Sequence, residues 1–254
     1  MATIQIKNIG PITDTGIIPL TSVMLVIGKQ SSGKSTFLKI LCFCRWMEKL
    51  IMVSDEEAIS QYTHNLKFLK SMKQFHRFND SYFSSASSIR YEGDTITITM
   101  ENILSDVKIL RKPEFETVRY NTKLSFIPSE RNLVSVIRNI DQSYRSAESD
   151  VLFNYIFEWG EAKDSYTAEH PKRLSFTDNI EYINDGGNDL VRLINENKMI
   201  PAYYASSGVQ SAMPLDVMVD YFTGLVGKNA SVSKHDLANT LARYLGKDKE
   251  PVSY

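Results

Sequence analysis

Hydrophobic residues follow three patterns near the start of the chain. The stretch ATIQIKNI (2–9) alternates polar and apolar residues, which predicts an edge or second-layer strand. The run SVMLVI (22–27) is continuously apolar and predicts a strand buried on both faces. From Lys34 to Leu50, apolar residues nearly surround the predicted helix, so we expect neighbouring segments to cover most of it. A buried strand, a loop and a helix are therefore expected in direct succession.

Residues further along predict more helices and two hairpins. A capping box of Ser54 and Glu57 begins a predicted helical stretch that reaches about residue 86. Alternating runs at 88–100 and 179–194 each surround a turn that contains glycine, which predicts two β-hairpins.

Three shorter segments complete the pattern. TKLSFIP (122–128) predicts a short strand, ERNLVSVIRNI (130–140) predicts a helix, and another helix follows the candidate cap Ser149 or Asp150. The sequence has no repeat and no low-complexity linker. One strand–loop–helix core with an inserted helical lobe and β-hairpins therefore fits better than two independent domains.

Composition and charge narrow the class of protein. The chain has 254 residues, of which 43% are hydrophobic and 23% charged, as in ordinary soluble domains. Its formal net charge of -1 excludes a broadly basic nucleic-acid coat, so DNA contact would need a local patch. The run 64–78 interleaves basic and aromatic residues, but such a run is more typical of a solvated amphipathic helix.

The sequence also points away from membranes and disulfides. No apolar run approaches the roughly 20 residues that span a bilayer, and the first residues lack the design of a secretory signal. The two cysteines, Cys42 and Cys44, are interpreted as reduced, buried residues. The four histidines are scattered without ligand spacing, so no histidine metal site is predicted. We expect a cytoplasmic protein that has no membrane partner.

The stretch LVIGKQSSGKSTFLKIL (25–41) carries the strongest chemical signal, because it satisfies the P-loop pattern G-x-x-x-x-G-K-[ST]. Its glycines let amide N–H groups turn toward a phosphate chain, and the following helix adds its positive end. Lys34 can reach the β- and γ-phosphates, Ser35 can be a Mg²⁺ ligand, and Thr36 would face the α-phosphate side. The predicted nucleotide-binding residues are Gly28, Lys29, Gln30, Ser31, Ser32, Gly33, Lys34, Ser35 and Thr36. A guanine-specific Asn-Lys-x-Asp is absent, so the expected cofactors are ATP and Mg²⁺.

A second stretch, YYASSGVQSAMPL (203–215), resembles the signature motif of ABC-type ATPases. In that motif a Ser and a Gly at a helix N-terminus bind the γ-phosphate held by the opposite subunit. Ser207, Gly208 and Gln210 are the matching residues here. The alternative is a plain capping box of Ser207 and Gln210, which needs no ligand. Pro214 would lie about two turns into this helix and is expected to kink it.

Taken together, IKNIGPI, IGKQSSGKST, FIPSERN and ASSGVQSAMPL resemble the SMC/ABC-type AAA ATPases of bacteria. Within these, the overcoming-lysogenization-defect family and the ATPases of anti-phage Septu and retron systems are most similar in pattern. The resemblance covers residues 1 to about 225. It implies an α/β fold, a P-loop NTPase of the ABC/SMC head type with β-hairpins and an inserted helical lobe, incomplete in this chain. The single head would comprise a P-loop core (1–50), a helical insertion (51–87), hairpins and helices (88–200), and the signature helix with C-terminal helices (201–254).

The same resemblance implies a homodimer that forms on ATP binding. Two ATP molecules would lie between the P-loop of one chain and the signature of the other. Glu130 and Arg131 would form a Q-loop-like element that senses Mg²⁺ or the γ-phosphate. The alternative for these two residues is a solvated helix N-terminus, with Ser129 as its cap.

An acidic strand is missing from the pattern. ATPases of this kind need an apolar strand that ends in Asp-Glu after the signature, to steady Mg²⁺ and orient the attacking water. LDVMVDY (215–221) is the nearest match, but it follows the signature as predicted helix. We therefore name no catalytic residue. We expect a piece of a longer ATPase, with a nucleotide binder of little turnover as the alternative.

Three functions are compatible with these residues. The first is an ATP-binding head that dimerises on ATP and regulates a partner nuclease or other effector, in anti-phage defence or DNA metabolism. The second is a non-hydrolysing, nucleotide-dependent interaction module. The third is a P-loop small-molecule kinase, which the lack of an arginine-rich lid disfavours.

Overall fold

The computed structural model describes residues 1–53, 56–64, 66–113, 123–144 and 150–225. The chain divides into two compact units, residues 1–126 and 127–254, and each is described by itself. Within the described residues, no helix is both long and apolar enough to cross a membrane. The predicted mixture of helices and strands is confirmed, and both sheets are antiparallel.

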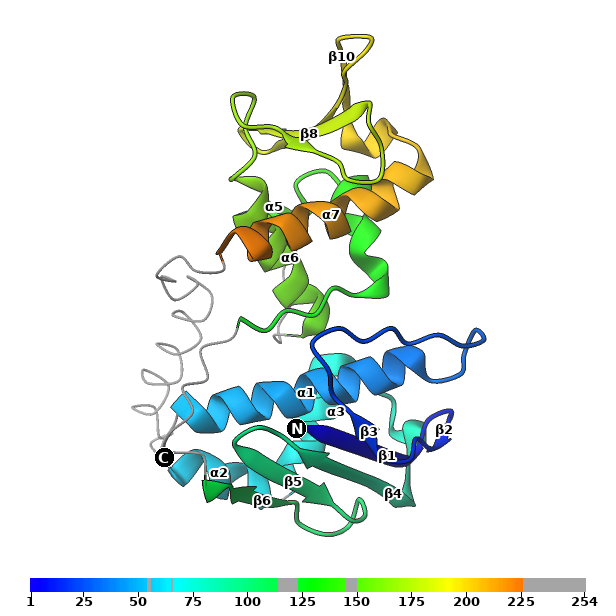
Figure 1. Ribbon diagram of the computed structural model, residues 1–254, viewed down its shortest axis with the longest axis vertical. Helices are drawn as coiled ribbons and strands as arrows, with labels where there is room; N and C mark the ends of the chain where they lie inside the picture. Colours follow the sequence, from blue (N-terminus) through cyan, green and yellow to red (C-terminus); the bar gives the residue numbers. More distant parts are fainter. Residues whose placement is uncertain (54–55, 65, 114–122, 145–149, 226–254) are drawn as a thin grey trace, which may run out of the picture. The chain divides into compact units, whose positions relative to one another are not determined.

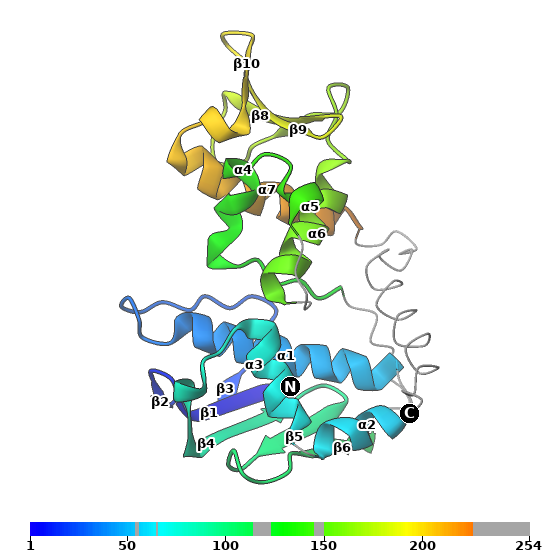
Figure 2. The same cartoon turned by 180° about the vertical axis from the view of Figure 1, so that it is seen from behind.

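Unit 1 is built on one antiparallel sheet with the strand order β2-β1-β4-β5-β6, in which β3 also pairs with β1. Helices α1 and α3 lie over one face of this sheet (Figures 1 and 2). The elements are β1 (Thr3–Ile9), β2 (Ile12–Asp14), β3 (Ile18–Pro19), α1 (Lys34–Val53), α2 (Glu56–Thr63), α3 (Lys67–His76), the 3-10 turn η1 (Asp80–Tyr82), β4 (Phe83–Glu92), β5 (Ile96–Met100) and β6 (Lys108–Arg111).

The core of unit 1 lies between the sheet and α1. Ile4 and Ile6 of β1 are buried at alternate positions, as period two requires of a strand with one covered face. On the helix side, Phe37, Ile40 and Met47 are also buried. The prediction of a strand at 2–9 is confirmed, but β1 is not an edge strand, because it lies between β2 and β4 in the sheet. The prediction of a largely covered helix from Lys34 is also confirmed.

The predicted buried strand at 22–27 is wrong. This segment is in no strand, and it runs along the side of α1 that faces away from the sheet (Figure 1). Met24 and Val26 pack against the core, whereas Val23, Leu25 and Ile27 are 86%, 86% and 82% exposed. A continuous apolar run predicts two covered faces only where strands flank it, and no described strand pairs with this one.

The predicted helix over residues 54–86 is correct only in part. It consists of α2 and α3, and α3 ends where Arg77 takes a left-handed conformation with φ of 55°. The serine-rich end belongs to β4, where Ser84 N donates to Ser87 Oγ over 2.9 Å. Helix α3 buries Phe68, Leu69, Met72 and His76, which agrees with the amphipathic interpretation of the run 64–78. The predicted capping box at Ser54 lies outside the described residues.

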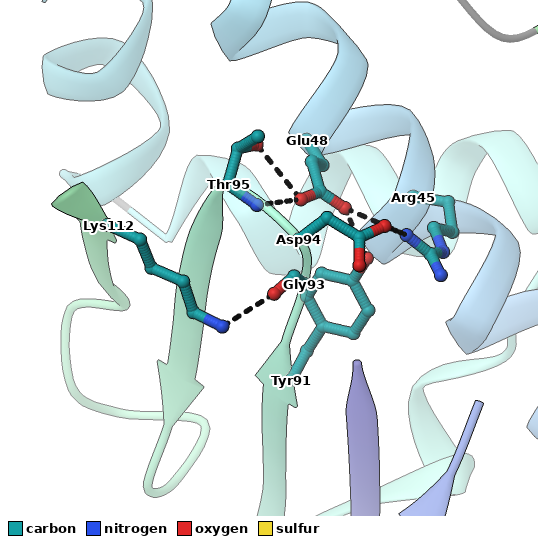
Figure 3. Close-up of polar contacts among 7 residues, drawn as sticks. All are labelled: Arg45, Glu48, Tyr91, Gly93, Asp94, Thr95 and Lys112. Carbon is teal, nitrogen blue, oxygen red and sulfur yellow. Dashed lines mark hydrogen bonds and ion pairs between the residues drawn. The ribbon is translucent and has the colours of Figure 1, made fainter. Parts of the chain in front are cut away.

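A buried carboxylate joins the far end of α1 to the β4–β5 turn (Figure 3). Glu48 has no exposed surface, and its side chain accepts hydrogen bonds from four donors. These donors are Thr95 N (2.7 Å), Thr95 Oγ1 (2.9 Å), Tyr91 Oη (2.5 Å) and the Arg45 guanidinium (3.2 Å). Arg45 also pairs with Asp94 at 2.9 Å. We call Arg45, Glu48, Tyr91, Asp94 and Thr95 the Glu48 cluster.

Gly93 completes this contact, because a Cβ atom at that position would lie only 2.6 Å from Glu48 Cδ. Its carbonyl accepts a hydrogen bond from Lys112 Nζ over 2.6 Å. The predicted hairpin at 88–100 is confirmed. Its turn also contacts and helps to bury the carboxylate of Glu48. Such a charge is stable only when its lone pairs are satisfied, as they are here.

Unit 2 contains a four-stranded antiparallel sheet in the order β10-β9-β8-β7, packed with helices. Trp159, Tyr155, Tyr182, Met213 and Val217 form the centre of its core. The elements are η3 (Ser129–Asn132), α4 (Leu133–Val136), α5 (Ile140–Ser143), α6 (Val151–Lys163), β7 (Lys172–Arg173), β8 (Ile180–Asp185), β9 (Asn188–Leu193), β10 (Lys198–Pro201), η4 (Ala202–Tyr204) and α7 (Ser207–Leu225).

Two predictions for unit 2 are confirmed. Asp150 caps α6, since its Oδ1 accepts from Leu152 N (3.0 Å) and Phe153 N (2.8 Å). Strands β8 and β9 form the second hairpin, and its turn places Gly186 and Gly187 at φ of 60° and 113°. Glycine takes such angles at little cost, which is why Gly-Gly is one of the favoured pairs in a two-residue hairpin turn.

Two other predictions for this region are wrong. The described residues of 122–128 form no strand. The helix predicted over 130–140 is broken into η3, α4 and the start of α5, because Ile137 is extended and Asn139 is left-handed with φ of 51°. Val136 and Ile137 are exposed and Ser135 is buried, so the apolar spacing predicted neither the buried side of this segment nor these two interruptions.

Candidate functional site

The P-loop residues lie directly before α1. Ser31 and Gly33 both have positive φ, 59° and 94°, so the chain turns back on itself before the helix begins. Ser32 N donates to Lys29 O over 3.3 Å, and Phe37 N donates to Gly33 O over 2.8 Å. The loop therefore ends at the N-terminus of a 20-residue helix, where free amide groups and the helix dipole favour an anion. No acidic residue stands in the first turn of α1.

Position 33 needs glycine for two reasons: its φ is positive, and a larger side chain would clash with its neighbours. A Cβ atom there would lie 2.6 Å from Ile12 Cγ1 and 3.4 Å from Pro11 Cγ. The β1–β2 turn is thus one wall of the loop. The sequence placed IKNIGPI in the family resemblance but did not predict this contact. A Cβ at Gly28 would lie 2.8 Å from Ser32 Oγ, which can rotate away, so Gly33 is the more constrained of the two glycines in the motif.

The Lys34 side chain folds back over the loop. Its ammonium group donates to Gly28 O (2.9 Å) and to Lys29 O (2.6 Å). A positive charge is therefore held beside the loop amides, which is where a phosphate chain would need it. Gln30 and Ser32 are exposed on the same loop.

Ser35 and Thr36 differ in exposure. Ser35 is exposed at the start of α1, whereas Thr36 is buried. Within the described residues, no group of three or more His, Cys, Asp or Glu side chains could hold a metal ion. Mg²⁺ fits this chemistry, because it binds phosphates and nucleotide sites with few protein ligands and retains several waters. Ser35 is the side chain that would join such an ion.

The signature-like residues lie at the start of α7. Ser207 and Gly208 are exposed, and a Cβ on Gly208 would meet nothing within 4 Å. Ser206 is the cap, since Val209 N donates to its Oγ over 3.4 Å, so the predicted capping box of Ser207 and Gln210 is wrong. Gln210 Nε2 instead donates to Tyr203 O over 2.9 Å. Helix α7 continues through Pro214 without interruption.

Glu130 and Arg131 lie in η3, in unit 2, together with the signature-like residues. Arg131 Nε donates to Ser211 O of α7 over 3.0 Å, and Tyr155 Oη donates to Arg131 O over 2.9 Å. Glu130 accepts from Ser129 Oγ over 2.9 Å, and no side chain caps this 3-10 turn. The predicted cap at Ser129 is therefore wrong. Arg131 ties η3 to the signature-like helix.

The two acidic residues of LDVMVDY, Asp216 and Asp220, make hydrogen bonds within unit 2. This stretch is part of α7, where Asp216 accepts from Ser175 N and Asp220 accepts from Lys172 Nζ (2.7 Å) and Tyr166 Oη (2.8 Å). The Lys172 and Tyr166 hydrogen bonds lower the pKa of Asp220, against the opposing effect of its burial. Both carboxylates therefore join α7 to the start of the unit 2 sheet.

The cysteines and histidines form no site within the described residues. Cys44 is buried, which raises the pKa of its thiol, and Cys42 is partly buried; neither forms a disulfide. His64 contacts Asp106 at 3.4 Å on an exposed surface, and His235 lies outside the described residues. Buried His76 is surrounded by aromatic rings, among them Phe43, Phe75 and Phe126.

Comparisons of the chain with protein-family models, curated proteins and solved structures give no match.

Proposed function

We propose that this protein binds Mg-ATP at the loop Gly28–Ser35. The proposal is carried by one observation: the loop curls back before a long helix, with Lys34 held over its carbonyls. A loop of this shape offers backbone donors, a helix N-terminus and an ammonium group to one phosphate chain. Mg²⁺ would supply charge neutralisation between the phosphate oxygens, and Ser35 would contribute one ligand to it.

The larger role that we propose is that of an ABC/SMC-type P-loop ATPase head that dimerises on ATP and regulates a partner effector. Exposed Ser207 and Gly208 at the start of a 19-residue helix support this role, because they offer a second anion-binding surface. Anti-phage defence or DNA metabolism is the setting implied by the family resemblance, and the cytoplasm is the location expected from the sequence.

A nucleotide-dependent interaction module with little turnover is the second candidate function. It is favoured by the hydrogen bonds of Asp216 and Asp220, which hold the nearest candidate acids in contacts within unit 2. A carboxylate that is committed to a lysine or to a backbone amide is a poor base for orienting water.

The Lys34→Ala variant tests the loop. Because Lys34 supplies the charge-assisted contacts to phosphate, we expect its loss to weaken Mg-ATP binding at least about 100-fold. Calorimetric titration of the purified chain with Mg-ATP measures this. The control is Lys70→Ala, which removes the same charge from an exposed position on α3. Equal affinity of Lys34→Ala and wild type would refute the assignment of the loop.

The Ser207→Arg variant tests dimerisation. A bulky cation at an exposed helix start would obstruct a γ-phosphate held by a second chain. We therefore expect an ATP-dependent dimer of the wild-type protein and a monomeric variant that still binds ATP. Sedimentation velocity with and without Mg-ATP distinguishes them. Asn195→Arg, at an exposed position of the same unit, is the matched control. A normal ATP-dependent dimer of Ser207→Arg would contradict the signature interpretation.

A further inference from the structure

An aromatic ring is held in place at the P-loop end of unit 1 and remains partly exposed. Both views of the chain show the start of α1, the β1–β2 turn and η1 at the same end of this unit (Figures 1 and 2). Tyr82, the last residue of η1, keeps 37% of its surface exposed there. A ring in that place, next to a phosphate-binding loop, is a surface on which a nucleotide base could lie.

Several contacts fix the position of Tyr82. Asn79 caps η1 by accepting from Ser81 N over 2.9 Å, and Gly10 N donates to Tyr82 O over 2.7 Å. The ring lies against Gly10, where a Cβ atom would be 2.5 Å from Tyr82 Cδ1. Phe78 packs on it with ring centroids 5.6 Å apart. The Tyr82 side chain is therefore ordered before any ligand binds.

The same short turn connects Tyr82 to the wall of the loop. Gly10 contacts the ring, and Pro11 and Ile12 lie against Gly33. Consecutive Cα atoms are about 3.8 Å apart, and two peptide units separate Gly10 from Ile12. The Tyr82 ring against Gly10 therefore lies within the length of a nucleotide from the loop beside Ile12. Gly10 has φ of 54° and Asn8 has φ of 50°, which set the path of the chain at this turn.

We propose that the Tyr82 ring is the stacking surface for the base of the nucleotide whose phosphates the loop holds. This inference rests on the proposed function. A flat base gains by stacking on an aromatic ring, and a ring that is already fixed loses little freedom when the base arrives. Every base has a π-face, so this contact selects a nucleoside triphosphate over a bare phosphate chain rather than one base over another. The phenol hydroxyl has no role in it.

Calorimetric titration of the full chain with Mg-ATP and with Mg-tripolyphosphate tests the proposal. The second ligand has the phosphates and lacks the base and ribose. We expect Tyr82→Ala and Tyr82→Leu to bind Mg-ATP about tenfold more weakly than wild type and to bind Mg-tripolyphosphate unchanged. Leucine retains apolar bulk against Gly10 and Phe78 but has no π-face, whereas Tyr82→Phe retains the ring and should bind as wild type does.

The outcomes separate this proposal from the one on which it rests. Wild-type affinity of Tyr82→Leu for Mg-ATP would overturn the stacking role, because packing alone would then suffice. An equal loss for both ligands would overturn it too, because it would show that Tyr82 only supports the loop wall. A wild-type chain that binds neither ligand would reject the loop itself, and Tyr82 with it.

Discussion

Replacing Glu48 with alanine should lower the free energy of unfolding of unit 1 by about 3–5 kcal/mol, the effect expected when one partner of a buried ionic contact is removed. The variant leaves Thr95 N, Tyr91 Oη and Arg45 without the carboxylate that accepts from them. A cavity at a position with no exposed surface adds to this loss. Because Glu48 joins α1 to the β4–β5 turn, both elements should be affected together.

The two tryptophans allow unit 1 to be measured by itself. Trp46 lies in α1 and Trp159 in α6, so a Trp159→Phe background leaves Trp46 as the fluorescent reporter of unit 1. Urea unfolding in this background compares Glu48→Ala with Glu101→Ala, which removes an exposed carboxylate and should change stability by less than about 0.5 kcal/mol. A loss of under about 1 kcal/mol for Glu48→Ala would show that the cluster contributes little net stability.

Acidification should destabilise unit 1 through His76. Burial, with a smaller effect from nearby Lys39, lowers the pKa of His76 to about 3, from an ordinary value of 6.5. Between these two values the unfolded chain binds a proton that the folded chain does not, so stability falls as the pH falls. The contribution is full above pH 6.5 and should be reduced by about 3 kcal/mol at pH 4.

The His76→Phe variant isolates this effect from the titration of carboxylates. Within the described residues neither imidazole nitrogen has a hydrogen-bond partner, and the surroundings are aromatic, so phenylalanine should fit. The difference in unfolding free energy between wild type and His76→Phe should change with pH between 7 and 4 and remain constant above 7. His64→Phe, which replaces an exposed histidine of the same unit, is the matched control. Parallel pH profiles of wild type and His76→Phe would contradict the prediction.

Local patterns predicted much of the fold because they depend on neighbours in sequence. The strand at the N-terminus, helix α1, both hairpins and the Asp150 cap are all set by periodicity or turn chemistry over a few residues. The exposed segment 22–27 shows the limit, since its apolar run could not indicate whether strands would flank it. The Glu48 cluster shows another limit, because its hydrogen bonds from Tyr91 and Thr95 to Glu48 join residues more than 40 positions apart.

Some features of the candidate site could likewise be predicted from the sequence, and others could not. The loop and its two glycines could be predicted, because the motif specifies them residue by residue. The wall made by Pro11 and Ile12 could not, because it depends on a contact across about 20 residues of chain. Gln210 was correctly placed at the start of α7, but its amide reaches back to η4 instead of closing a capping box. Neighbouring residues alone do not predict whether such a glutamine closes a capping box or donates to a preceding carbonyl.

The contact between Gly93 and Glu48 also bears on how this sequence can change over evolutionary time. With glutamate at 48, any larger residue at 93 would overlap the carboxylate, so the glycine cannot vary first. If a shorter side chain replaced Glu48, the space opposite would be released and position 93 could accept other residues. Relatives should therefore have a residue other than glycine at 93 only where Glu48 has been replaced as well. Such joint substitution at 48 and 93 would mark two lineages that diverged at this buried contact.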